Sequence, residues 1–276
     1  MKKIEACLEC VRCHKHYDLS QVRYNCECGG ILDLVRDLSQ VDGGELKALW
    51  DSRWGLKRGA TSSGVWRYKE LIFDLPDDRI VTRQEGNTRL YEAGKAGVYA
   101  GLKNFLLKHE GENPTGSFKD RGMTCGATAA KYYNAKTVAC ASTGNTSASM
   151  ASYAAVSGME SVIFIPEGKI AYGKLAQALA YGGKTLQIRG NFDDAMALVQ
   201  DVCRELNIYL LNSINPFRIE GQKAIGFEVL QQLDWQVPDW FVSPGGNLGN
   251  NTALSKGMKE LYDLGIINKI PRIAVV

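Results

Sequence analysis

The chain has 276 residues and a mass of 30.4 kDa, enough to bury a substantial core in one large domain or two smaller ones. Its composition, with 45% hydrophobic and 23% charged residues and a net charge of +3, is that of an ordinary soluble globular protein. The charges are scattered, and no apolar run reaches the ~18–20 residues that cross a bilayer. We therefore expect neither a nucleic acid nor a membrane as partner.

Residues 1–35 are predicted to form a cysteine-rich module. The first residues run into cysteines rather than into the apolar segment of a signal peptide, so we expect a cytoplasmic protein. In that reducing compartment, closely spaced cysteines are metal ligands more often than disulfides. Four thiolates suit a closed, structural zinc site. The expected ligands are Cys10, Cys13, Cys26 and Cys28, with Cys7 as the alternative to Cys10 and four unliganded cysteines as the alternative to zinc.

From about residue 80 the chain alternates between strands and helices, whereas residues 36–80 give weaker signals. Such alternation predicts parallel strands and an α/β fold. The last predicted strand is apolar and ends the chain, although parallel strands are normally covered on both faces. We therefore expect the sequence to stop inside its second domain. The strands are expected over 137–142, 161–165, 184–189, 208–212, 240–243 and 272–276, and the helices over 146–156, 173–181, 191–207, 219–233 and 249–264.

The loop N-P-T-G-S-F-K-D-R-G at 113–122 places Lys119 in the first turn of a helix. A lysine is locally unfavourable at that positive end of the helix dipole. Desolvated lysines with a lowered pKa form Schiff bases with carbonyl cofactors. Taken alone, however, the motif favours a solvated Lys-Asp-Arg triplet on a helix surface.

Three further loops follow predicted strands, where α/β proteins bind ligands. The loop S-T-G-N-T-S at 142–147 offers hydroxyls and helix-start N–H groups to a carboxylate, with simple helix capping as the alternative. The loop G-G-N-L-G-N at 245–250 lets backbone N–H groups face a phosphate, and it is not a dinucleotide-binding fingerprint. In the segment 212–218, Arg218 suits a second phosphate or a carboxylate, unless it is a lone surface arginine.

In this order, the four loops resemble the threonine synthase family of fold-type II pyridoxal-phosphate enzymes. The resemblance covers about 80–276 and includes the motif N-P-x-R-x-E-G-Q-K, while the cysteine module resembles the zinc ribbon of part of that family. It implies a two-domain α/β fold with parallel sheets. The implied parts are a zinc-ribbon-like module at 1–35, the N-terminal part of the large domain at 36–115, a smaller α/β domain at 116–212, and the start of the C-terminal part of the large domain at 213–276.

The resemblance also implies a role for each matching residue. Lys119 is expected to hold pyridoxal 5′-phosphate and to move protons, and Asn145 to bind the 3′-oxygen of its ring. The cofactor phosphate is expected on Gly246, Asn247, Leu248, Gly249 and Asn250. Thr88 (followed by Arg89 where the family has proline), Ser142, Thr143, Thr146, Asn212, Ser213 and Arg218 are expected to bind the substrate, the last three its phosphate.

The reaction implied is the conversion of O-phospho-L-homoserine and water to L-threonine and phosphate. The family's partner for the pyridine nitrogen is expected beyond Val276, and the full-length protein is expected to be a homodimer. One alternative is cysteate synthase, with O-phosphoserine and sulfite as substrates. The others are another β- or γ-replacement enzyme or dehydratase of the same fold, and a non-catalytic zinc-ribbon binding protein.

Overall fold

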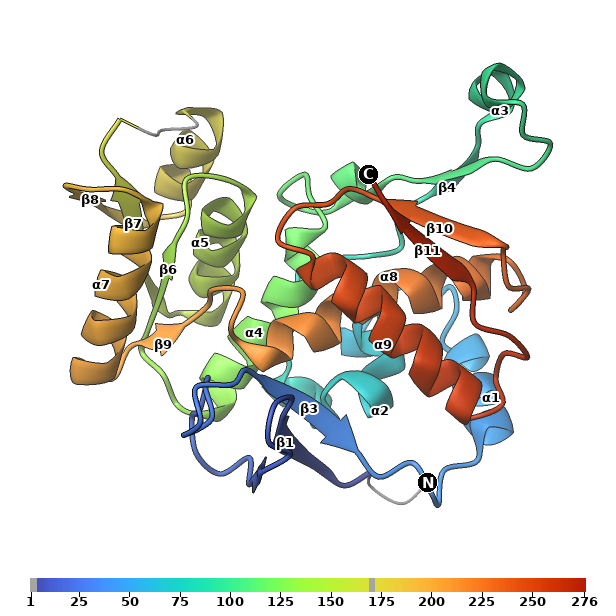
Figure 1. The fold of residues 1–276 in the computed structure, drawn as a ribbon, viewed down its shortest axis with the longest axis horizontal. Coiled ribbons are helices and arrows are strands. Elements are labelled where there is room, and N and C mark those ends of the chain that lie inside the picture. Colours follow the sequence, from blue (N-terminus) through green and yellow to red (C-terminus); the bar gives the residue numbers. More distant parts are fainter. Residues whose placement is uncertain (1–3, 169–171) are drawn as a thin grey trace.

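The computed structural model describes residues 4–168 and 172–276. It has two bodies, one built on a parallel sheet and the other on long helices, with a small N-terminal sheet packed below the helices (Figure 1). The predicted α/β class with parallel strands is confirmed. Among the described residues, no helix is both long and apolar enough to span a bilayer.

The N-terminal sheet is antiparallel and has the order β2-β1-β3. Its strands are β1 (Ala6–Cys10), β2 (His16–Tyr17) and β3 (Leu32–Arg36). Leu8 and Leu34 face each other across β1 and β3 and are fully buried, because every second residue of a strand points to the same face. The region that follows, where the sequence patterns are weak, contains α1 (Gly43–Ser52), α2 (Lys69–Ile72) and short 3₁₀ turns at Ala60–Ser62, Trp66–Tyr68 and Asp77–Arg79.

The sheet of the first body has four parallel strands in the order β8-β7-β6-β9. They are β6 (Thr137–Ala141), β7 (Glu160–Pro166), β8 (Lys184–Ile188) and β9 (Tyr209–Leu210), joined by α5 (Asn145–Ser157), α6 (Tyr172–Ala180) and α7 (Phe192–Glu205). Asn191 caps α7 in a reciprocal capping box with Asp194.

The strand predicted at 208–212 is shorter in the structure and ends at Leu210. The side chain of Asn212 takes the place of further backbone pairing: Ala141 N donates to its Oδ1 (2.9 Å), and its Nδ2 donates to Ala141 O (3.0 Å). The chain can therefore turn away from the sheet while the end of β6 keeps its hydrogen bonds.

The second body is formed by α4 (Lys119–Tyr132), α8 (Pro216–Gln232) and α9 (Gly249–Asp263), with α8 packed between the other two. Helix α8 begins three residues earlier than predicted because Asn215 caps it and Pro216 suits its first position. Strands β10 (Trp240–Ser243) and β11 (Arg272–Val275) pair in parallel beside α9.

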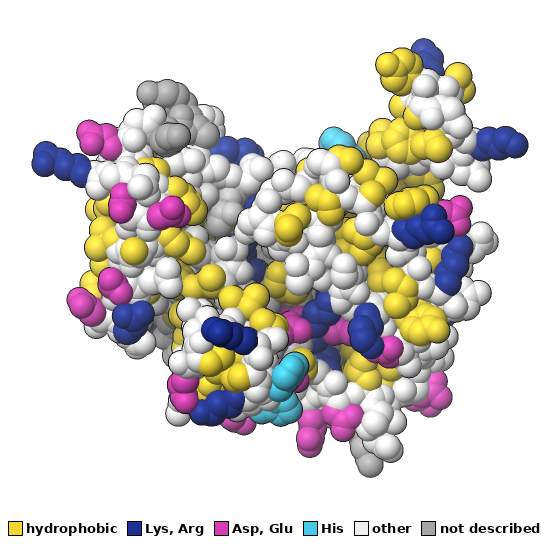
Figure 2. All heavy atoms as spheres, in the orientation of Figure 1, with side chains coloured by type: hydrophobic (Ala, Val, Ile, Leu, Met, Phe, Trp, Pro, Cys, Tyr) yellow, Lys and Arg dark blue, Asp and Glu magenta, His cyan; other side chains and the backbone are white. Residues whose placement is uncertain are grey.

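An arm extends from this body, formed by β4 (Leu90–Glu92), α3 (Gly94–Ala100) and β5 (Leu106–Lys108), and a 3₁₀ turn at Glu110–Glu112 leads back (Figure 1). Its tip carries exposed apolar side chains (Figure 2), with Tyr99 96% exposed.

Candidate active site

A cavity of about 110 Å³ lies where the two bodies meet. It is lined by the starts of α4, α5, α7 and α8, by the end of β6, by the loops that follow β6 and β9, and by the loop before α9. The structure thus brings together residues from all four loops singled out in the sequence. The lining residues are Lys119, Ala141, Ser142, Thr146, Phe192, Asn212, Ser213, Arg218 and Asn247, of which all but Ala141 and Phe192 were expected.

Lys119 is the first residue of α4, as the sequence predicted. The loop before it is fixed by the carboxylate of Asp120, which accepts from Thr115 N and from Thr115 Oγ1, both at 2.7 Å. Ser149 of α5 donates to the same carboxylate at 2.5 Å. Gly116 has a φ of +79°, which favours glycine. The position of Lys119 is therefore set by a buried network rather than by its own contacts.

The electrostatics of the cavity are those of an anion site. Burial lowers the pKa of Lys119 to about 8, and the charge of Arg218 adds to this lowering. Arg218 is only 3% exposed, and burial lowers its pKa to about 10, which leaves it charged at neutral pH. Within the described part of the chain, no carboxylate forms an ion pair with either residue. Two cations without a counterion favour an anionic ligand.

Arg218 has unused hydrogen-bonding capacity. Its Nη1 donates to Leu211 O at 3.2 Å, whereas its Nε is buried and has no partner among the residues described. Because a buried donor without a partner is costly, a ligand oxygen in the cavity would satisfy it.

Three helices start beside the cavity without a capping side chain at their N-cap residues, namely Phe118 for α4, Gly144 for α5 and Leu248 for α9. Leu248 has a φ of +62°, and Gly249 N donates to Asn247 Oδ1 at 3.3 Å. The side chains of Asn250 and Asn251 each contain a buried polar atom that has no hydrogen-bond partner among the described residues. Open N–H groups at a helix start bind phosphate or carboxylate groups.

Several predicted residues lie outside the lining of the cavity. Asn145 is exposed at the start of α5, and Thr143 lies at a shallow depression with Ser142 and Ser147. In the glycine loop, Gly246 and Leu248 are exposed, and Gly249 and Asn250 are partly buried at the start of α9.

Thr88 is buried in a network of charged residues instead of facing the cavity. Its Oγ1 donates to Glu110 Oε1 (2.8 Å) and accepts from Arg121 Nη2 (3.1 Å), while its backbone N donates to Glu228 Oε1 (3.1 Å). Arg121 and Lys108 also pair with Glu228, at 2.8 Å and 2.5 Å. All the hydrogen-bonding groups of Thr88 are engaged in holding this network.

Two residues near the cavity were missed by sequence reasoning. Phe192 lines it and is 51% exposed. It starts a helix directly after β8, so the strand-end rule that identified the other loops could have found it. Lys174 of α6 donates to Thr115 O at 3.0 Å, in the loop that carries Lys119. Nothing in the sequence around Lys174 distinguishes it from a surface lysine.

The four cysteines expected as ligands come together at one end of the N-terminal sheet. Their Sγ atoms all lie within 4.8 Å of one another, with 3.5 Å for both Cys10–Cys28 and Cys13–Cys26. Tetrahedral zinc with Zn–S bonds of about 2.3 Å holds its sulfurs about 3.8 Å apart. Cys7 is not in this cluster, because it lies within β1 opposite Val35. The geometry therefore favours Cys10 over Cys7.

The family is decided by comparison with known proteins. A family model described as "Pyridoxal-phosphate dependent enzyme" matches residues 81–276. The chain belongs to this family. The match contains all four cavity loops, and dependence on pyridoxal phosphate follows from it. The fold is also that of maize serine racemase, with a TM-score of 0.60 at 23% identity, over 69% of this chain and 55% of that one.

Two curated relatives are threonine synthases from archaea. That of Methanocaldococcus jannaschii is 48% identical over 264 residues, which are 96% of this chain and 63% of that protein. That of Methanosarcina acetivorans is 50% identical over 270 residues, again 96% and 63%. The chain thus spans somewhat less than two thirds of the length of these relatives.

The residues of this chain fit the family's cofactor. Lys119 offers an amine with a lowered pKa and no carboxylate partner in the described structure. The start of α9 offers open N–H groups beside it, since Asn247 and Lys119 line the same cavity. An amine and a phosphate site on one cavity wall are the two attachment points that pyridoxal phosphate needs.

Proposed function

We propose that the chain provides the cofactor lysine and the phosphate-binding residues of a threonine synthase, which converts O-phospho-L-homoserine and water to L-threonine and phosphate. One observation carries the proposal. Arg218, a buried cation without a carboxylate partner among the described residues, shares a cavity with Lys119. It lies near the start of α8, on a different helix from the one that follows Asn247, and we infer a second anion site there beside that for the cofactor phosphate. The archaeal threonine synthases named above support the choice of substrate.

In this proposal each residue acts at a stated atom of the substrate. Bound pyridoxal phosphate supplies the electron sink that makes the substrate's Cα–H acidic. Lys119, neutral in an appreciable fraction near its pKa of about 8, takes the Cα proton and then a Cβ proton. Arg218 binds the phosphate that leaves from Cγ, and Ser213 lies beside it. Water adds its hydroxyl at Cβ, its second proton leaves with the released phosphate, and Lys119 returns protons to Cγ and Cα.

The remaining residues hold the substrate and the cavity wall. Ser142 and Thr146 line the cavity beside the open start of α5 and suit the substrate carboxylate. Asn212 contributes differently from the expectation, because its amide group is bonded to Ala141 on both sides. We propose that it keeps the wall in place rather than assisting phosphate departure.

The substrate is tested by phosphate release. O-phospho-L-homoserine is expected to give phosphate and L-threonine in equal amounts, and Arg218→Met to raise KM by about ten- to a hundredfold, since a charge-assisted pair is lost. Release from O-phosphoserine with sulfite, and none from O-phospho-L-homoserine, would identify a cysteate synthase instead. The assay uses this chain and the same chain extended to the length of its relatives.

The cofactor lysine is tested independently of turnover. Borohydride reduction in the presence of pyridoxal phosphate is expected to label the peptide that contains Lys119. Lys119→Ala should abolish the label, whereas Lys131→Ala, at the far end of the same helix, should retain it. Absence of label at Lys119 in both polypeptides would overturn the proposal and leave the non-catalytic binding protein.

We further propose that Cys10, Cys13, Cys26 and Cys28 bind a structural zinc ion. Their spacing supports this, and Gly30 is placed where a Cβ atom would lie 2.7 Å from Cys10 Sγ. The domain boundaries, the cytoplasmic location and the homodimer stay predictions of the sequence.

A further inference from the structure

Tyr24 links the cysteine-rich module to the wall of the cavity. It lies in the loop between Cys13 and Cys26, two residues before Cys26. Its hydroxyl accepts a hydrogen bond from the backbone N of Leu210 at 2.8 Å, and its ring packs edge-on against Tyr209 with centroids 5.8 Å apart. The contact spans 186 residues of sequence.

This hydrogen bond satisfies a backbone N–H group at the edge of the four-stranded sheet. Strand β9 is the edge strand and, within residues 4–168 and 172–276, pairs with β6 alone. The N–H of Leu211 points to β6 and donates to Ala139 O at 2.8 Å. Since successive N–H groups of a strand point to opposite sides, the N–H of Leu210 points outward, and the Tyr24 hydroxyl satisfies it.

The segment held by Tyr24 leads directly to the anion-binding residues. Arg218 Nη1 donates to Leu211 O. Among the described residues, this is the hydrogen bond that holds the guanidinium group. Asn212 and Ser213 follow and line the cavity. A shift of Leu210 and Leu211 would therefore move both the support of Arg218 and the adjoining wall.

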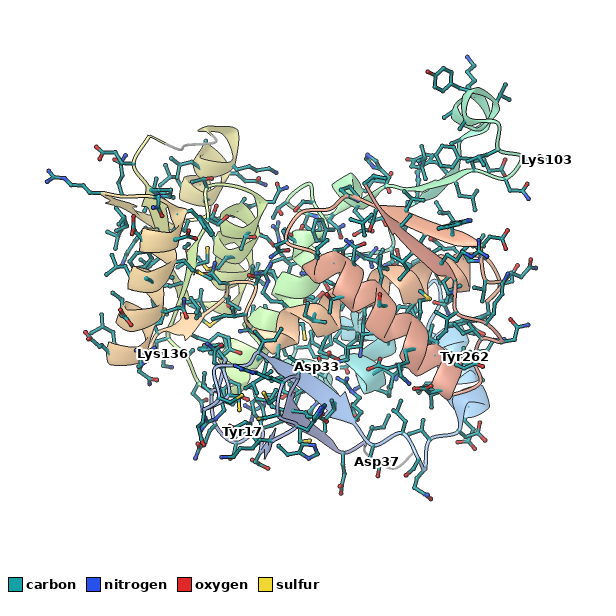
Figure 3. The ribbon with its side chains drawn as sticks, viewed as in Figure 1. Tyr17, Asp33, Asp37, Lys103, Lys136 and Tyr262 are labelled. Atoms are coloured by element: carbon teal, nitrogen blue, oxygen red, sulfur yellow. The ribbon has the colours of Figure 1, made fainter. Side chains whose placement is uncertain are left out.

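Two ion pairs also join the cysteine-rich module to helices α8 and α9, so the position of the module relative to these helices is fixed. Figure 3 labels Asp33 on β3. Its carboxylate pairs with Lys256 of α9 at 2.6 Å, and Arg36 of β3 pairs with Glu220 of α8 at 2.5 Å. Glu220 is fully buried and lies two residues after Arg218. Strand β3 pairs along its length with β1, where Leu32 faces Cys10 of the cluster.

We propose that Tyr24 is a positioning residue for the phosphate subsite, and that metal bound to the four cysteines raises the affinity of the cavity for a phosphate group through it. The metal fixes the loop between Cys13 and Cys26, the loop presents Tyr24, and Tyr24 holds Leu210 and with it the support of Arg218. This inference rests on the proposed function, because the phosphate subsite belongs to that proposal.

The test removes only the hydroxyl. Tyr24→Phe is expected to weaken binding of inorganic phosphate about three- to tenfold, as measured by calorimetry on the chain already loaded with pyridoxal phosphate. Hydrogen exchange of the Leu210 amide is expected to accelerate, while that of Leu211, bonded to Ala139, stays slow. An unchanged phosphate affinity together with an unchanged Leu210 exchange rate would overturn the inference.

Tyr133→Phe is the matched control. Tyr133, which follows the last residue of α4, also bridges to the module by donating its hydroxyl to Leu19 O at 2.9 Å, but it makes no hydrogen bond to the segment 210–213 in the described structure. Its loss is expected to leave phosphate affinity and Leu210 exchange unchanged. Equal effects of both substitutions would mean general loosening of the module and would overturn the role of Tyr24.

Arg218→Met separates this inference from the proposed function. If Arg218→Met leaves phosphate affinity unchanged, the phosphate subsite and the proposed function fail. If it abolishes binding while Tyr24→Phe has no effect, only the inference fails. For the metal, a chelator is expected to accelerate Leu210 exchange and weaken phosphate binding in the unsubstituted chain, and to add little in Tyr24→Phe. No response of Leu210 to metal removal would overturn the metal dependence.

Discussion

Gly122 of α4 lies against the backbone carbonyl of Arg218 of α8: a Cβ atom added to Gly122 would come within 2.8 Å of that oxygen. The two helices therefore cross with their backbones almost in contact, which only a residue without a side chain allows. Lys119 lies one turn before Gly122. This close crossing brings Lys119 and Arg218 into one cavity, where the guanidinium helps to lower the pKa of the lysine.

Gly122→Ala should separate α4 and α8 and destabilise the fold by about 1–3 kcal/mol, the usual cost of overpacking a core. Alanine otherwise favours a helix over glycine by about 1 kcal/mol, so a net loss identifies the contact as the cause. Urea unfolding measures it. The control is Gly94→Ala at the start of α3, where an added Cβ meets nothing within 4 Å. Equal stability of the two variants would contradict the importance of the crossing.

The reactivity of Lys119 should rise with pH around a midpoint of about 8, well below that of an ordinary lysine near ~10.4. Burial is the larger cause and Arg218 the smaller. Removing the positive neighbour by Arg218→Met should therefore move the midpoint upward, while burial keeps it below the ordinary value. The measurement is the initial rate of reductive labelling by pyridoxal against pH, with Lys131 as internal reference. A midpoint that falls in Arg218→Met would contradict the assigned electrostatics.

Sequence reasoning identified most of the cavity because parallel strands place their carboxyl ends at one edge. Lys119, Ser142, Asn212, Arg218 and Asn247 all follow that rule or start a helix beside it. The position of each of these residues follows from a strand, a turn and a helix start that are close together in the sequence, and such local patterns can be predicted from it.

The contacts of Thr88 and Asn212 could not be predicted from such local patterns. The surroundings of Thr88 are set by Glu228, 140 residues away, and by Arg121, and no local pattern reveals such a network. The position of Asn212 after a strand was predicted correctly. Its side-chain amide, however, bonds to the backbone of Ala141 in place of a further strand residue. That contact depends on where β6 ends in space, which the sequence around Asn212 does not show.

Glu228→Gln should destabilise the fold by about 3–5 kcal/mol, since among the described residues it leaves Lys108 without a counterion and the buried Arg121 with Glu110 as its remaining one. Burial opposes the charge of Glu228, but Arg121 and Lys108 outweigh it and lower its pKa to about 2. Between that value and the ordinary pKa near ~4.3, the unfolded chain binds more protons. The stability that Glu228 contributes is therefore full above this window and is lost as the pH falls through it.

Acid titrations of unfolding free energy test this prediction. Glu228→Gln should lose less stability between pH ~4.3 and 2 than the unsubstituted chain, because the titrating group is gone. Glu160→Gln removes one partner of an exposed pair with Lys184 and should change stability by less than about 1 kcal/mol. An acid profile that is unchanged in Glu228→Gln would contradict the account.

Cys26→Ser should remove the metal from the cysteine cluster and unfold the N-terminal module, because three thiolates and a hydroxyl bind zinc far less firmly than four thiolates do. Cys7→Ser is a matched control: Cys7 lies on β1, the strand that ends at Cys10, but outside the cluster. It should retain one metal ion per chain, as measured by elemental analysis after gel filtration. Metal retained by Cys26→Ser, or lost from Cys7→Ser, would show that the ligand set is not the one the sulfur positions indicate.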